Sequence, residues 1–198
     1  MASGLTDRER AKADRQAALL QEASRLFAER GFSGASLEDV GAAVGVSGPA
    51  VYRHFANKQA LLGAILVRVS ERLRAGGERV VKTVPGAPEQ LTALIRFHVD
   101  FALTDADVIR VQDRDLASLS EDDRHRVRRL QREYVEVWIA VLRRLHPGRS
   151  EQELRVRAHA VFGLINSTPH SVRGVRGAPG EPAVRAILQE MAAAALSA

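Results

Sequence analysis

Apolar residues recur three and four positions apart along almost the whole chain, which is the spacing of helices with one buried face. Glycine and proline cluster between these segments, and no run alternates between apolar and polar residues as a half-buried strand does. The pattern therefore predicts an all-α fold. The predicted helices are residues 10–30, a long helix after Lys58 that fades near 76–77, then 89–103, 105–119, 121–146, one from Ser150 to a loop at Pro169, and 181–196.

The stretch SLEDVGAAVGVSGPAVYRHFANK, residues 36–58, contains the signals of two short helices joined by a tight turn. Ser36 and Asp39 have the spacing of a capping box at the start of the first helix. Gly45 supplies the residue expected where that helix stops, and Ser47 can cap the second helix. This order predicts a helix-turn-helix, which places its second helix in the major groove of DNA.

Polar and small residues of this motif are the candidates for DNA contact, because Val51 and Phe55 are expected to face the core. Ser36 can bind phosphate or only cap its helix, and Arg53 can bind phosphate or pair with a carboxylate. Lys58 is expected to hold phosphate at the start of the following helix. The predicted DNA-binding residues are Ser36, Ser47, Gly48, Ala50, Tyr52, Arg53, His54 and Lys58.

Charge and composition add less than the pattern does. The net charge is +5, but acidic and basic residues nearly balance over the first 60 positions, so local placement is more informative than the total. The basic residues Arg8, Arg10, Lys12 and Arg15 can reach DNA or remain in a solvated arm. No signal peptide and no apolar run of about 20 residues is evident, which predicts a cytoplasmic protein without a membrane partner.

Catalytic and metal-binding patterns are missing from the sequence. The chain has no cysteine, which excludes disulfides and thiolate metal sites. Its six histidines lack metal-site spacing, and no phosphate-binding or hydrolase motif occurs. We therefore expect no enzyme, no metal and no cofactor, although a Ser–His–Asp set could assemble from separate segments.

Three segments together resemble the TetR family of transcriptional regulators: A-x-x-L-F-A-E-R-G-F over residues 23–32, S-L-E-D-V-G-A-A-V-G-V-S, and the closing V-Y-R-H-F-A-N-K. The resemblance implies a helix-turn-helix head over 1–60 and a helical effector and dimerisation domain over 61–198. It implies a homodimer on a palindromic operator, most often a repressor that leaves DNA when a small molecule binds. The alternative is a helix-turn-helix protein that has no effector.

The effector domain of such a protein would enclose an apolar pocket with a few polar groups. The resemblance implies an apolar or acyl-CoA-like effector, whose phosphates the arginines of 124–132 could bind. Acidic residues accompany those arginines, so a solvated helix face is the other interpretation. The candidate ligand-binding residues, each of which could instead be ordinary core, are Phe97, Phe101, Gln112, Tyr134, Trp138, Phe162, Asn166 and His170.

The last two predicted helices carry the apolar residues expected at the subunit interface. In the family such helices from two subunits form a four-helix bundle, whereas an intramolecular role would only cap the core. The predicted interface residues are Val161, Ile165, Val184, Ile187, Leu188 and Met191.

Overall fold

A computed structural model describes residues 6–172 and 175–197, and over 169–172 it describes the backbone alone. All regular structure in these ranges is helical, which confirms the predicted all-α fold. None of the described helices is both long and apolar enough to cross a membrane. The elements are α1 (Asp7–Gly34), α2 (Leu37–Ala43), α3 (Gly48–Tyr52), α4 (Lys58–Thr83), α5 (Ala87–Thr104), α6 (Ala106–Asp115), the 3₁₀ turn η1 (Leu116–Ser118), α7 (Glu121–Leu145), α8 (Glu151–Val172) and α9 (Glu181–Ser197).

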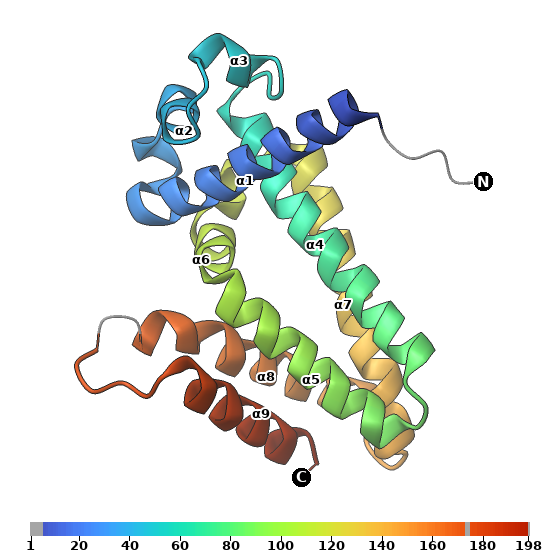
Figure 1. The fold of residues 1–198 in the computed structure, drawn as a ribbon. Helices are drawn as coiled ribbons and strands as arrows, with labels where there is room; N and C mark the ends of the chain where they lie inside the picture. Colours follow the sequence, from blue (N-terminus) through green and yellow to red (C-terminus); the bar gives the residue numbers. More distant parts are fainter. Residues whose placement is uncertain (1–5, 173–174, 198) are drawn as a thin grey trace.

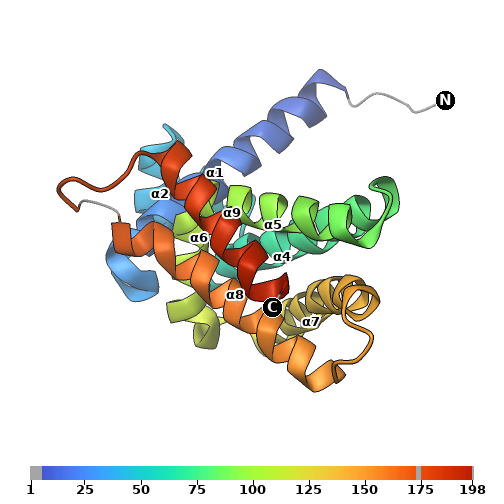
Figure 2. The ribbon, with the colours of Figure 1, turned by 90° about the horizontal axis from the view of Figure 1, so that it is seen from below.

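The helices form a small head and a larger body that share α4 (Figure 1). In the head, α1 lies across the beginning of α4, and α2 and α3 sit at the top of the view. In the body, α4 and α7 run side by side, while α5 packs against α7, α8 and α9. Figure 2 shows α8 and α9 together on the underside of the molecule. The short helix α6 packs against α1 and therefore connects the body to the head.

The first helix begins earlier than its apolar pattern predicts. Thr6 and Glu9 form a capping box, in which the Glu9 backbone N–H donates to Thr6 Oγ1 at 3.3 Å. The helix therefore starts at Asp7 instead of residue 10. Its predicted end at Gly31 is confirmed as a break, since this glycine has a φ of +83° that other residues rarely adopt.

The long helix α4 does not fade at its paired glycines, as the sequence predicted, but continues to Thr83. Both glycines are buried, and neighbouring rings occupy the space where side chains would be. A Cβ on Gly76 would lie 2.1 Å from Phe97, and one on Gly77 would lie 2.8 Å from Tyr134. The glycines thus let α5 and α7 approach closely, and this packing outweighs their poor helix propensity.

Two apolar clusters make up the core. One joins α1, α2 and α3 to the first half of α4, and it includes Val111, Leu119, Val127 and Leu130 from the body. The other fills the space between α5, α7, α8 and α9. Because the first cluster contains body residues, the head is packed onto α6 and α7 as well as joined to them by the chain.

The last loop is also shorter than predicted, since α8 continues to Val172.

Candidate nucleic-acid interface and effector core

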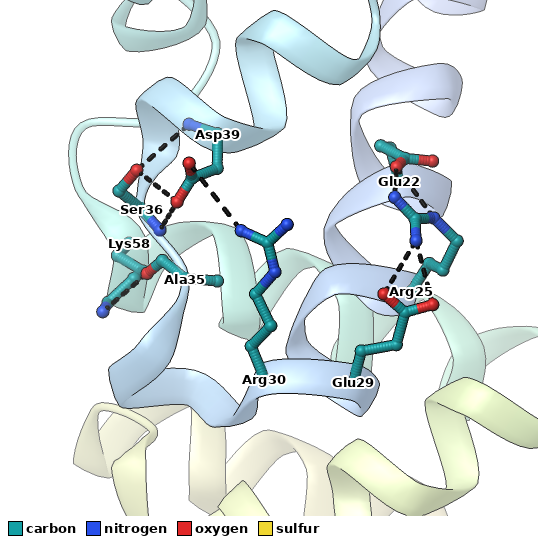
Figure 3. Close-up of polar contacts among 8 residues, drawn as sticks. All are labelled: Glu22, Arg25, Glu29, Arg30, Ala35, Ser36, Asp39 and Lys58. Carbon is teal, nitrogen blue, oxygen red and sulfur yellow. Dashed lines mark hydrogen bonds and ion pairs between the residues drawn. The ribbon is translucent and has the colours of Figure 1, made fainter.

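The helix-turn-helix is built as its local signals predict. The Asp39 backbone N–H donates to Ser36 Oγ at 3.0 Å, and the Ser36 N–H donates to the Asp39 carboxylate at 2.9 Å (Figure 3). These hydrogen bonds from Ser36 lower the pKa of Asp39. Ser36 is therefore a true helix cap, and it stays half-buried at the beginning of α2.

The turn brings α2 and α3 into close contact through two glycines. Gly45 has a φ of +71°, which ends α2 and reverses the chain. Gly41 is buried, and a Cβ there would lie 2.8 Å from the Val51 side chain and 2.9 Å from the Val46 carbonyl oxygen. Only a residue without a side chain permits this approach, so Gly41 allows α2 and α3 to pack this closely.

The outer face of α3 carries polar residues that the sequence analysis predicts to contact DNA. Val51 is fully buried and holds the helix to the head, whereas Tyr52 is 49% exposed. The Tyr52 hydroxyl donates to Glu38 Oε1 at 3.2 Å, and the negative charge of Glu38 raises the pKa of Tyr52. Ser47 is exposed at the N-cap of α3, and its side chain makes no capping hydrogen bond. Its hydroxyl therefore remains accessible to a partner.

Positive charge from two helices converges beside α3. Partial burial lowers the pKa of His54, and the charges of Lys12, Arg15 and Arg53 lower it further. The last three side chains are exposed and form no ion pair with any residue that the structure describes. Lys12 and Arg15 belong to α1 and are therefore held by a helix and not by a frayed arm, while contact with DNA stays a prediction.

Lys58 makes structural contacts that the sequence analysis did not predict. Its Nζ donates to the Ala35 carbonyl oxygen at 2.9 Å and lies 4.7 Å from the centre of the Phe32 ring (Figure 3). The ammonium group thus joins the end of α1 to the first residue of α4. A phosphate contact at this position would have to share the ammonium with these partners.

In the body, four of the candidate ligand-binding residues gather around a histidine that sequence reasoning passed over. His98 Nδ1 lies 3.2 Å from the Tyr134 hydroxyl, and His98 Nε2 lies 3.2 Å from Asn166 Oδ1. The ring of Phe162 is 4.7 Å from the His98 ring and 5.0 Å from that of Trp138. The apolar spacing of α5 could have identified His98, since it shares the buried face.

Burial sets the charge of this cluster. It lowers the pKa of His98 to about 4, with the Asn166 hydrogen bond acting in the opposite direction. Burial also raises the pKa of Tyr134, so both groups are neutral at pH 7. Trp138 is fully buried, and its side chain lies close enough to the Tyr134 hydroxyl to lower the pKa of Tyr134 against the effect of burial.

The remaining ligand candidates lie at or outside the edge of this cluster. Phe101 is buried 5.8 Å from the His98 ring, with Arg72 over its other side at 5.6 Å. Phe97 packs on α4 as described above, and Gln112 is half-buried on α6. The His170 side chain lies outside the described residues.

A surface groove and the arginine-rich part of α7 both contain basic side chains that are paired with carboxylates. An open groove of about 420 Å³ lies between α1, α4 and the start of α6, where Arg72 pairs with Asp105. In the arginine-rich part of α7, Arg126 pairs with Glu71 at 2.5 Å and Arg129 lies 3.8 Å from Glu133. The arginines of 124–132 thus form an exposed, partly paired helix face.

The predicted interface residues divide into two groups. Four of them are at most 6% exposed because they pack inside the chain's own core, so they cannot also form an outer face; these are Val161, Ile165, Val184 and Leu188. Ile187 and Met191 are about half exposed on α9, and Val156 on α8 is 68% exposed. The outward apolar face therefore contains two of the predicted interface residues, Ile187 and Met191, together with Val156, which the sequence analysis did not name.

A three-helix head with an exposed recognition helix and adjacent basic residues, joined to a helical body, defines a helix-turn-helix protein of the regulator class. Residues 19–65 match the sequence model for bacterial regulatory proteins of the tetR family, and residues 85–170 match a tetracyclin repressor-like C-terminal domain. The chain belongs to the TetR family of bacterial regulatory proteins, which confirms the resemblance.

Similar proteins include regulators of both signs. The transcriptional activator FasR of Mycolicibacterium smegmatis is 31% identical over 98 residues, 50% of this chain and 45% of FasR. The transcriptional repressor Rv3405c of Mycobacterium tuberculosis is 41% identical over 71 residues, 34% of this chain and 38% of that protein. The matches thus span less than half the length of these relatives.

Solved structures share the fold over most of the chain. A TetR-family regulator from Bordetella parapertussis has a TM-score of 0.77 at 22% identity and covers 89% of this chain and 93% of its own. AibR, solved with isovaleryl coenzyme A and operator DNA, has a TM-score of 0.74 at 19% identity and covers 89% of this chain and 97% of its own. At these identities the similarity concerns the fold alone.

Proposed function

We propose that this protein is a DNA-binding transcriptional regulator that acts as a homodimer in the cytoplasm and responds to a small-molecule effector. The head, residues 1–60, would bind an operator, and residues 61–198 would bind the effector and the second subunit. The observation that carries the proposal is the exposed positive face formed by Lys12, Arg15 and Arg53 beside the recognition helix. Such a face attracts the phosphate backbone, while neighbouring side chains reach base edges.

Helix α3 would enter the major groove with its small residues leading. Gly48 and Ala50 are partly exposed and leave room for close approach, and the Ser47 hydroxyl has no capping bond to break. Tyr52 would contact backbone or base edges from the same face. Lys12 and Arg15 would hold phosphates beside the groove, because they flank the end of α3 at His54.

The subunits would associate through the outer face of α8 and α9. Val156, Ile187 and Met191 expose apolar side chains there, which is the composition expected at the centre of a subunit interface. A two-fold dimer would present two heads, and a palindromic operator matches that symmetry.

The His98 cluster is the proposed effector site. It combines aromatic walls with a few polar atoms, as small-molecule sites do. Tyr134 belongs to the cluster and packs directly on Gly77 of α4, the helix that begins at the head. We propose a repressor, because an effector that displaces Tyr134 would move α4. The spacing of the two heads would then no longer match the operator. No catalytic role is proposed.

Selection from a random pool of duplex DNA tests the function directly. The full-length protein should enrich one palindromic sequence and bind it with nanomolar affinity at moderate salt, as specific regulators do. Arg53→Gln should weaken binding to that sequence, whereas Arg25→Gln should not, because Arg25 is paired with Glu22 and Glu29 away from α3 (Figure 3). Failure to enrich any sequence would refute the proposal. Operator binding that no metabolite alters would favour the alternative without an effector.

A further inference from the structure

The groove of about 420 Å³ lies where the head meets the body, and no residue of the His98 cluster lines it. Its walls come from α1, α4 and the junction of α5 and α6, which meet below the crossing of α1 and α4 in Figure 1. This volume is within the range of small-molecule sites, about 300–1,000 Å³. The apolar residues of its lining are Ala17, Leu20, Ile65, Val69 and Val108.

Charged side chains also line the groove, and most of them neutralise one another. Arg25 pairs with Glu22, and Arg72 pairs with Asp105. Arg68 is exposed, and it forms no ion pair with any residue in the described ranges. It lies one helical turn before Arg72 on α4, so the two guanidinium groups share a face of that helix. The groove therefore keeps one positive charge without a partner, beside a second guanidinium group.

The unpaired charge selects the sign of a ligand. A carboxylate matches the planar guanidinium group and accepts two parallel hydrogen bonds from it. A cation would be repelled by Arg68, and it would have to displace an arginine to reach Glu22 or Asp105. Asp107, the remaining acidic residue of the lining, is not free to receive a cation either. The groove is therefore complementary to a single negative group.

The apolar part of the lining limits the size of the ligand. Ile65 and Val69 flank Arg68 on α4 and are only 4% and 5% exposed, whereas Ala17 and Val108 are half-buried. Covering the surface that remains exposed favours binding in proportion to its area. Because this area is small, a short hydrocarbon chain covers it and a long one would extend into solvent.

We infer that this groove binds a compact organic monocarboxylate, whose carboxylate contacts Arg68 and whose short apolar part lies against α1, α4 and α6. The site is separate from the proposed effector site in the body. Its ligand contacts the head through α1 and the body through α6, so it holds the two parts in one relative position.

Four probes separate the effect of charge from that of apolar contact, with the full-length protein and no DNA present. Hexanoate carries both features, acetate lacks the chain, 1-hexanol lacks the charge, and hexylammonium reverses the charge. Titrations followed by ligand-observed NMR at moderate salt give each dissociation constant. We expect about 1 mM or lower for hexanoate, as a molecule of this size allows, and values about fivefold higher or more for the other three.

Variants of α4 and α1 locate the site. Arg68→Gln removes the charge, so hexanoate should bind about fivefold more weakly. Arg79→Gln is the matched control, because Arg79 is also an exposed arginine of α4 without an ion pair to a described residue, but it does not line the groove. Ala17→Phe fills the groove and should weaken binding by a similar factor, whereas Ala18→Phe alters an exposed neighbour outside the lining and should not.

Several results would overturn the inference. They are the absence of hexanoate binding up to about 10 mM, where even weak ligands of this size should bind, and binding of 1-hexanol as tight as that of hexanoate. Equal affinity of Arg68→Gln and Arg79→Gln for hexanoate, or of Ala17→Phe and Ala18→Phe, would also overturn it. Circular dichroism confirms that each variant is folded. Because no measurement contains DNA, a negative outcome leaves operator binding standing.

Discussion

Tyr52 and Lys58 belong to the same helix-turn-helix motif, but their side chains make different kinds of contact. Tyr52 is half exposed, and its one hydrogen bond goes to an exposed carboxylate. Lys58 joins two helices through a carbonyl oxygen and an aromatic ring. Loss of the first side chain should therefore affect a partner, while loss of the second should also affect the fold.

Tyr52→Ala should weaken operator binding severalfold or more and change the free energy of unfolding by no more than about 0.5 kcal/mol. Lys58→Met should lower the free energy of unfolding by about 1 kcal/mol, because it removes a charge-assisted hydrogen bond and a cation–π contact. Urea unfolding and DNA-binding titrations of both variants separate the two roles. Equal stability of the two variants would contradict the assignment of Lys58.

His98 predicts a specific dependence of stability on pH. Its folded pKa of about 4 lies below the ordinary 6.5, so the unfolded chain binds more protons between these values. The stability that neutral His98 contributes is complete above pH 6.5 and is lost as the pH falls toward 4. The loss should reach about 3 kcal/mol in wild type relative to His98→Gln. Parallel stability curves for the two proteins over this pH range would show that His98 is not buried as described.

The structural roles of individual residues were predicted correctly where these roles depend on neighbours in the sequence. The Ser36–Asp39 cap and the turn at Gly45 follow from spacing alone, and both are present. The apolar spacing of α5 places His98 on the buried face, but its hydrogen-bond partners lie 36 and 68 positions away along the chain, so the sequence did not show the cluster that it joins. Lys12 and Arg15 remained undecided because only the folded head shows them beside α3.

At the scale of elements, the glycine pair in α4 shows how packing can override a local signal. A Cβ on Gly77 would lie 2.8 and 3.1 Å from two atoms of the buried Tyr134 ring. The sequence could not predict this, because a glycine that ends a helix and one that admits a ring look alike without the neighbouring helix.

Gly77→Ala should lower the free energy of unfolding by about 1 kcal/mol, since overpacking costs about 1–3 kcal/mol and better helix propensity returns about 1. Chemical denaturation measures the change. The control is Gly148→Ala, where a Cβ meets nothing within 4 Å and stability should stay within about 0.5 kcal/mol. A stabilised Gly77→Ala variant would mean that α4 and α7 are not packed this closely.

For the whole molecule, the pattern that predicted the fold could not separate two kinds of apolar residue. Ile165 and Leu188 recur at helical spacing because they fill the core, and Ile187 and Met191 recur because another face of α9 is also apolar. Periodicity gives the number and type of helices, but only the assembled body shows which face remains outside.

The double variant Ile187→Asp, Met191→Asp should convert a dimer into monomers, because charges replace the apolar groups of the proposed interface. Sedimentation velocity measures the change in mass, and circular dichroism should show unchanged helicity. Charged replacement of Ile187 and Met191 that left a stable dimer would place the interface elsewhere.

The most direct test of the central claim is the salt dependence of operator affinity. Each phosphate contact contributes about −0.9 to the slope of log K against log salt, so wild type should show a steep negative slope. Arg15→Gln and Arg53→Gln should each weaken binding and flatten the slope by about 1, while Arg25→Gln should leave it unchanged. A wild-type slope near zero, or one that neither Arg15→Gln nor Arg53→Gln alters, would contradict DNA binding by this face.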